Sequence, residues 1–192
     1  MNLPNKLTIL RCIMTPVFLF AMLVNFPGHY LVALVLFIAA SLTDMFDGRI
    51  AREQNLITNL GKFLDPLADK MLTTAAFLGL MTVIGGDMLC WAVMLILARE
   101  FMVTSVRLLA AKDGVVVAAS MAGKTKTVMQ MVAIIYMLTL LQVADWFGAM
   151  IPQGLATVLV VIGYVCIWVS VIATVVSGVE YVWQLRHYFK EN

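Results

Sequence analysis

Six long apolar segments alternate with short polar connections along the chain. They cover residues 7–26, 30–50, 61–84, 88–110, 126–144 and 155–179. Each is close to the length of about 20 residues that a helix needs to cross the hydrocarbon core of a bilayer. The pattern therefore predicts an all-α polytopic membrane protein with six transmembrane helices. Because no long polar linker interrupts it, we expect one membrane domain over residues 1–192.

The composition agrees with a membrane protein and argues against two other classes, soluble domains and nucleic-acid-binding proteins. The chain has 192 residues, of which 62% are hydrophobic, whereas soluble domains are about half apolar. The formal net charge is only +2, which argues against a strongly basic nucleic-acid-binding protein. The first residues lack the basic region of a secretory signal, and no small-residue cleavage site follows the first apolar run. We expect that segment to remain as a membrane helix.

Lysine and arginine gather at alternate helix ends. They lie near the N-terminus, after the second segment, around the connection after the fourth segment and at the C-terminus, and include Lys6, Arg11, Arg49, Arg52, Lys112, Lys124, Arg186 and Lys190. The connections near residues 26–29, 85–88 and 145–154 contain none. Because positive charge is enriched in cytoplasmic loops, both termini and the connection after the second segment are predicted to face the cytoplasm of a bacterial-type plasma membrane.

Four aspartates lie on the two sides of the connection after the second segment. If the second helix continues through residue 52, one arc of roughly 140°, at about 100° per residue, contains Asp44, Asp47, Gly48, Ala51 and Arg52. On the third helix, Gly61, Asp65 and Asp69 are spaced by four and share a face. Two helices joined by a tight connection can bring these stripes together around a polar cavity that opens to the cytoplasm.

Four close carboxylates repel one another, and a divalent cation resolves that conflict. Two Mg²⁺ or Mn²⁺ ions held by these carboxylates would clamp the attacking and leaving oxygens of an in-line phosphoryl displacement. One alternative is that the aspartates are solvated helix-end residues with no chemistry. Another is a cation transporter, since carboxylates in membrane helices mark ion pathways. A transporter more naturally holds its carboxylates near the bilayer midplane.

The string Asp44-x-x-Asp47-Gly48-x-x-Ala51-Arg52, eight residues, then Gly61-x-x-x-Asp65-x-x-x-Asp69 resembles the signature of the CDP-alcohol phosphotransferase family at every specified position. The resemblance implies two metal ions held by the four aspartates, Asp69 as the general base, and a homodimer. It also implies contacts to the CDP-linked donor from Asn5, Gly48, Ala51, Arg52 and Thr58, of which Asn5 belongs to an opening segment that resembles the family's own.

A second polar cluster is a candidate site for the phosphate of an acceptor. It contains Arg99, Arg107, Lys124 and Lys126, with Glu100 and Gln130 nearby. Arg99 lies well inside the fourth segment, so we expect it to face the bundle, a wet vestibule or a carboxylate, because exposure to lipid would be costly. Two alternatives remain open. The outer cations can serve ordinary inside-positive topology with snorkelling side chains, and Arg99 with Glu100 can form a structural ion pair.

The stretches Ala98-Arg99-Glu100, Gly123-Lys124-x-Lys126-Thr127 and Lys62–Lys70 resemble the branch of the family that uses sn-glycerol 3-phosphate as acceptor. The resemblance implies that CDP-diacylglycerol is the donor and that CMP is released. Branches that make phosphatidylinositol phosphate, phosphatidylserine or cardiolipin remain alternatives. An inositol phosphate acceptor would also need basic residues around its phosphate. A phosphatidylglycerol acceptor would need less positive charge.

Overall fold

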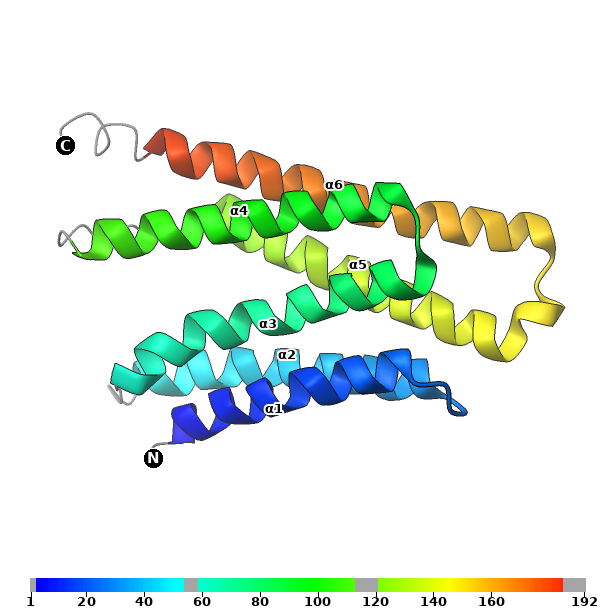
Figure 1. Cartoon of the computed structure of the whole chain (residues 1–192), viewed down its shortest axis with the longest axis horizontal. Helices are drawn as coiled ribbons and strands as arrows, with labels where there is room; N and C mark the ends of the chain where they lie inside the picture. The colour runs from blue at the N-terminus through cyan, green and yellow to red at the C-terminus, as the bar shows by residue number, and fades with distance from the viewer. Residues whose placement is uncertain (1–2, 54–58, 113–120, 185–192) are drawn as a thin grey trace. The chain divides into compact units, whose positions relative to one another are not determined.

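The computed structural model describes the backbone of residues 3–53, 59–112 and 121–184, and the side chains of residues 6–44, 68, 70–110 and 121–183. Its helices are α1 (Leu3–Leu23), α2 (His29–Glu53), α3 (Asn59–Ile84), α4 (Asp87–Lys112), α5 (Met121–Phe147), the short 3₁₀ helix η1 (Gly148–Met150) and α6 (Gln153–Gln184) (Figure 1). These described residues contain no strand. The all-α prediction is confirmed.

The six predicted apolar segments correspond one by one to the six long helices, but several ends differ. The first helix ends at Leu23, and the fifth begins at Met121, five positions before the predicted start at residue 126. The third helix begins at Asn59 and continues past Pro66 without a break. Between α3 and α4 only Gly85 and Gly86 remain, both with positive φ (74° and 94°), a conformation in which glycine carries no Cβ penalty.

Within the described residues, four helices are long and apolar enough to cross a bilayer. The stretches are Lys6–Leu23, Asp87–Ala110, Met121–Met150 and Gln153–Trp183, while α2 and α3 contribute shorter apolar stretches, His29–Asp44 and Lys70–Ile84. Large apolar side chains such as Phe20, Trp91 and Trp183 are exposed on these helices. Such surfaces are what a hydrocarbon solvent accepts, so the chain has the character of an integral membrane protein.

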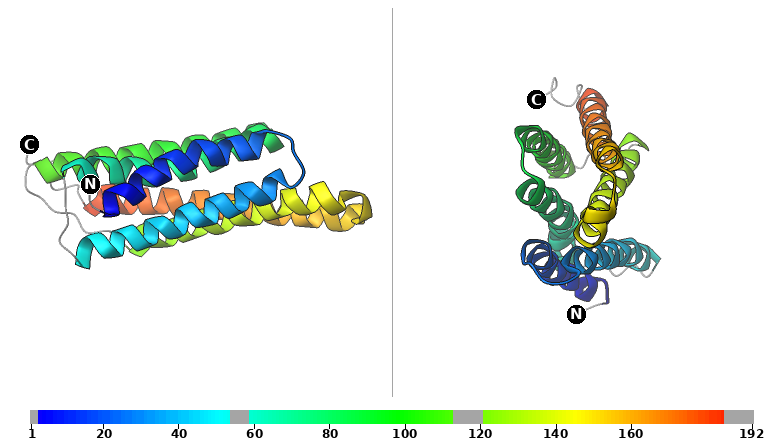
Figure 2. Two further views of the ribbon diagram at one scale, coloured as in Figure 1. Left: turned by 90° about the horizontal axis from the view of Figure 1, so that it is seen from below. Right: turned by 90° about the vertical axis from the view of Figure 1, so that its right-hand side faces the viewer.

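The chain divides into two compact units. Unit 1 comprises residues 1–85 and 135–157, and unit 2 comprises residues 86–134 and 158–192. In unit 1, α1 packs against both α2 and α3, and α1 and α2 run antiparallel as a hairpin (Figures 1 and 2).

The core of unit 1 brings its helices close together. The rings of Phe18 and Phe37 lie 5.8 Å apart between α1 and α2. Where α1 meets α3, a Cβ added at Gly79 would lie 2.6 Å from the sulfur of Met22, so a larger residue there would require the Met22 side chain to shift. The second half of α5 joins this unit through Gln142, whose Oε1 accepts a hydrogen bond of 2.5 Å from the Leu31 backbone N–H. The hairpin that carries the first aspartate is therefore firmly packed.

Unit 2 consists of α4, the first part of α5 and most of α6. Its buried residues include several polar side chains, among them Arg99, Glu100, Lys126, Gln130 and Ser177. In an apolar bundle, buried polar side chains need partners on neighbouring helices. Unit 2 supplies those partners, as described below.

Candidate active site

The first aspartate stripe lies on an unbroken helix. Since α2 runs from His29 to Glu53, the expectation that the second helix continues through residue 52 is confirmed. Asp44 and Asp47 are therefore three positions apart on continuous helical backbone, followed by Gly48, Ala51 and Arg52 at the next turn. Positions three and four apart share one face of a helix, so the backbone places this stripe in one register.

The second stripe lies on the first turns of α3. Gly61, Asp65 and Asp69 all fall within Asn59–Ile84. The end of α2 and the start of α3 lie at the same end of unit 1 (Figure 1). A chain from residue 53 to residue 59 spans at most about 20 Å when fully extended, so the end of α2 and the start of α3 lie within that distance of each other. Residues 54–58, which include Thr58, lie outside the described part of the chain.

The aspartates occupy one end of each helix and leave the rest apolar. In α2, no Asp, Glu, Lys or Arg precedes Asp44, and in α3 none follows Lys70. This places the carboxylates at helix ends and away from the middle of an apolar stretch. A site at the membrane surface needs carboxylates at this position, whereas a transport site usually holds them near the bilayer midplane.

Asp44 is the one predicted metal ligand whose side chain the structure describes. The side chains of Asn5, Asp47, Gly48, Ala51, Arg52, Asp65 and Asp69 lie outside the described residues. The Asp44 side chain is 43% exposed, and its Oδ1 lies 2.5 Å from Nη1 of Arg11 on α1. Arg11 itself is only 2% exposed. The sequence predicted Arg11 only as part of the inside-positive charge pattern, and no spacing in it indicated this ion pair.

The described features fit a site for hard divalent cations. The donor set consists of carboxylate oxygens, which Mg²⁺ and Mn²⁺ prefer, and Asp44 remains half-exposed although one oxygen is bonded to Arg11. Among the described side chains, no three His, Cys, Asp or Glu groups come together as a metal site. Because Asp47, Asp65 and Asp69 are not among them, the metal ligands remain a prediction.

The second predicted site is a buried ion cluster in unit 2. Oε1 of Glu100 lies 3.3 Å from Nη1 of Arg99 and also accepts a charge-assisted hydrogen bond from Nζ of Lys126. The exposed fractions of these three side chains are 11%, 9% and 9%. The structure therefore brings Arg99 and Lys126 together through a carboxylate, and the expectation that Arg99 faces the bundle is confirmed.

The ion cluster is tied to α6 by hydroxyl groups. Nη2 of Arg99 donates a hydrogen bond of 2.5 Å to Oγ of Ser177. One turn away, Nε2 of Gln130 donates to Oγ1 of Thr174 at 3.0 Å. Interhelical hydrogen bonds of this kind hold apolar helices in register, each contributing about 1 kcal/mol. The cluster thus joins α4, α5 and α6 within unit 2.

The other two predicted acceptor residues lie apart from this cluster. Arg107 is exposed, and its guanidinium carbon lies 5.7 Å from the ring centroid of Tyr181, a cation–π distance. Lys124 is exposed in the first turns of α5. Of the four cations predicted to hold an acceptor phosphate, the structure gathers two in the buried cluster and leaves two at the surface of unit 2.

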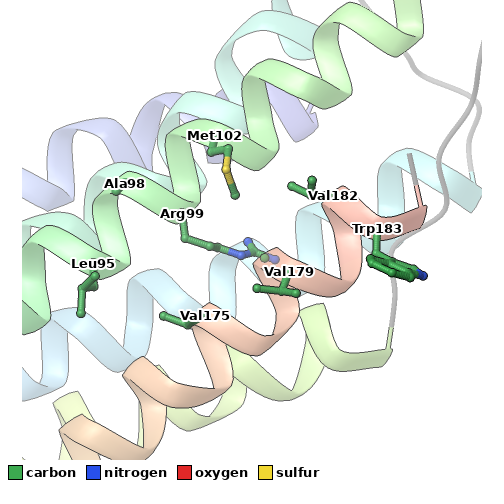
Figure 3. Close-up of a pocket in the computed structure, with 9 residues that line it drawn as sticks. Leu95, Ala98, Arg99, Met102, Val175, Val179, Val182 and Trp183 are labelled. Atoms are coloured by element: carbon green, nitrogen blue, oxygen red, sulfur yellow. The ribbon is translucent and has the colours of Figure 1, made fainter. Parts of the chain in front are cut away.

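An apolar cavity of about 520 Å³ lies beside Arg99 between α4 and α6. Figure 3 shows the Arg99 side chain leaving α4 and crossing toward α6 beside Val175 and Val179. Gly178 makes this crossing possible, because a Cβ added there would lie 2.8 Å from Cγ of Arg99. Sequence analysis gave no sign of Ser177 or Gly178, since their importance depends on a residue 78 or 79 positions away.

Residues 1–176 match the CDP-alcohol phosphatidyltransferase family. The chain therefore belongs to this family, which the unbroken signature on α2 and α3 had indicated.

Relatives with assigned names agree with one another. A protein of Bacillus subtilis strain 168, named CDP-diacylglycerol–glycerol-3-phosphate 3-phosphatidyltransferase, is 42% identical over 94% of this chain and 93% of its own length. One of the same name from Rickettsia bellii is 37% identical over 98% and 97%. A probable phosphatidylglycerophosphate synthase of Mycobacterium tuberculosis H37Rv is 40% identical over 94% of this chain and 80% of its own. The similarity covers nearly the whole chain.

Proposed function

We propose that this protein is a phosphatidylglycerophosphate synthase, a transferase of phospholipid biosynthesis. It transfers the phosphatidyl group of CDP-diacylglycerol to sn-glycerol 3-phosphate, forming phosphatidylglycerophosphate and CMP. The observation that carries the proposal is the near full-length identity of 42% to a relative with that activity in its name. The signature residues on the continuous helices α2 and α3 also support the proposal, because the family is expected to catalyse its reaction with these residues.

The reaction is a single displacement at phosphorus. Asp69 takes the proton from the acceptor hydroxyl, and the freed oxygen attacks the phosphorus that carries diacylglycerol. The new oxygen–phosphorus bond forms as the bond from that phosphorus to the bridging oxygen breaks, and CMP leaves with the electron pair. To act as the base, Asp69 must be ionised and within hydrogen-bond reach of the hydroxyl. No covalent enzyme intermediate is required.

Two divalent cations, Mg²⁺ or Mn²⁺, would be held by Asp44, Asp47, Asp65 and Asp69. When bound, such ions neutralise the charge that develops on the attacking and leaving oxygens. The described geometry supports this role through the half-exposed carboxylate of Asp44. The remaining ligands are proposed from the spacing of the signature on α2 and α3.

The donor is proposed to contact the same helix ends. The planar guanidinium of Arg52 suits a pyrophosphate, because it can donate two parallel hydrogen bonds. Gly48 and Ala51 leave space for the nucleotide to approach the helix backbone, and Asn5 and Thr58 complete the proposed set of contacts. The diacylglycerol chains would remain in the hydrocarbon between helices.

Arg99 and Lys126 are proposed to bind the phosphate of the acceptor, assisted by Arg107 and Lys124. The contacts in unit 2 support this role because two cations already converge on one carboxylate, Glu100. The same contacts are also those of a structural ion pair. The two roles predict different responses of a Glu100→Gln variant to added phosphate.

In the membrane we propose six spans in one domain over residues 1–192, with both termini and a polar cavity on the cytoplasmic side. The support is that the connections near residues 26–29, 85–88 and 145–154 contain no lysine or arginine, whereas the N-terminal segment and the connections after the second and fourth segments contain several. We also propose that the protein is a homodimer, as expected for this family.

The test is CMP release by purified protein with CDP-diacylglycerol, Mg²⁺ and a panel of acceptors. We expect release with glycerol 3-phosphate, and a loss of at least about 10²-fold in kcat for Asp69→Asn, from the general-base contribution. Asp87→Asn, at the exposed first turn of α4, is the matched control. Release only with inositol phosphate, serine or phosphatidylglycerol would refute the acceptor, and no release with any acceptor would refute the activity.

A further inference from the structure

The first helix contains none of the signature residues, yet it contributes a buried cation to the site. Arg11 of α1 is 2% exposed and bonds to Asp44 of α2, with 2.5 Å between Nη1 and Oδ1. A guanidinium is ionised at all accessible pH values and is expensive to bury without an anionic partner. Arg11 and Asp44 therefore form a real charge pair in the packed interface between α1 and α2.

Arg11 lies in a buried polar row on α1, and its backbone carbonyl accepts a side-chain hydrogen bond. Thr8 and Thr15 are also buried and lie one turn before and one turn after Arg11. Oγ1 of Thr15 donates a hydrogen bond of 2.9 Å to the carbonyl of Arg11. These three residues, spaced by three and four, form a polar row along the face of α1 that packs into unit 1.

We propose that Arg11 is a positioning residue that fixes the orientation of the Asp44 carboxylate for metal binding. This inference rests on the proposed function, in which Asp44 is a metal ligand. Arg11 holds Oδ1 at 2.5 Å, and the Asp44 side chain is 43% exposed at the end of the apolar part of α2. A ligand that is already held in one rotamer loses less conformational freedom when the metal binds.

The positive charge of Arg11 has two opposing effects on a cation site. It repels a metal ion, but it also offsets the mutual repulsion of the aspartates that must gather there. Partners that orient metal ligands usually contribute about 10–100-fold to metal affinity, so orientation is expected to exceed the repulsion. Removal of Arg11 should therefore weaken metal binding.

The experiment measures Mn²⁺ binding directly on purified protein without substrate, from the electron paramagnetic resonance signal of free Mn²⁺. We expect Arg11→Gln to raise the Kd by about 10–100-fold and Arg11→Lys to recover part of the loss. Saturating Mn²⁺ should restore most of the kcat of Arg11→Gln. Lys6→Gln, an exposed position on the same helix, should bind Mn²⁺ like the unmodified protein.

A double-variant cycle separates positioning from simple stabilisation. If Arg11 acts through Asp44, then Arg11→Gln should weaken Mn²⁺ binding little further in an Asp44→Asn background. An unchanged Kd for folded Arg11→Gln, with only a lower unfolding temperature, would overturn the proposal. The proposed function is refuted by a different result. If Mn²⁺ binding depends on Arg11 but the protein releases no CMP with any acceptor, the positioning role stands and the proposed function is wrong.

Discussion

Glu100 provides the sharpest test of what the buried cluster in unit 2 does. Its carboxylate bonds to both Arg99 and Lys126, and all three side chains are about nine-tenths buried. Glu100→Gln keeps the shape of the side chain but removes its charge. It leaves two cations close together in apolar surroundings.

The magnitude follows from the cost of an uncompensated buried charge. Removing one partner of a buried ion pair typically costs about 3–5 kcal/mol. For a chain of this size, each kcal/mol corresponds to about 2–4 °C in Tm, so we expect Glu100→Gln to lower Tm by about 6–20 °C. Glu100→Gln combined with Lys126→Met should recover part of that loss, because it removes one of the two cations.

The assay is thermal unfolding followed by tryptophan fluorescence, with Asp87→Asn as the exposed control. If Arg99 and Lys126 bind the acceptor phosphate, then glycerol 3-phosphate or inorganic phosphate should replace the lost carboxylate and raise the Tm of Glu100→Gln. A ligand at 100 times its Kd stabilises by about 2.7 kcal/mol. No rescue by either anion would show that the cluster is structural. A Tm within error of the control would refute the charge argument itself.

Two further predictions concern the packing of Arg99 against Gly178 and the dependence of the reaction on divalent metal ions. Gly178→Ala should lower Tm, because the added Cβ meets Cγ of Arg99 at 2.8 Å and displaces a hydrogen bond of a charged group, which contributes about 1.5–3 kcal/mol. Gly154→Ala, where an added Cβ meets nothing within 4 Å, should be neutral or slightly stabilising, and equal effects at both positions would contradict this explanation. Chelation of divalent cations should abolish CMP release and added Mg²⁺ should restore it, whereas full activity in excess chelator would refute a metal-dependent reaction.

The helices were predictable because each contains a long run of apolar residues, but their ends were not. Lys124 lies outside the predicted fifth segment, which starts at residue 126, yet it lies inside α5, which begins at Met121. Helical hydrogen bonding continues beyond the bilayer wherever the backbone allows it, so hydropathy marks the apolar part of a helix and not its full length.

The site was predictable where its geometry is local and not where it depends on distant contacts. The register of Asp44 and Asp47 follows from helical spacing alone, and the burial of Arg99 follows from the cost of exposing it to lipid. The pairing of Arg11 with Asp44 and of Arg99 with Ser177 joins different helices. A single sequence contains no spacing rule for such contacts, because they depend on how the helices pack.

The ion pair between Arg11 and Asp44 links the family signature to a helix that contains none of its residues. A chain truncated to start at α2 would retain every residue of the family signature, yet it would lose the arginine bonded to the first aspartate and the aromatic contact between Phe18 and Phe37. The signature therefore cannot be moved by itself into another membrane protein with all of its contacts intact. If Arg11 orients Asp44 as proposed, a helix placed before the signature needs a matching cation to keep the same metal affinity.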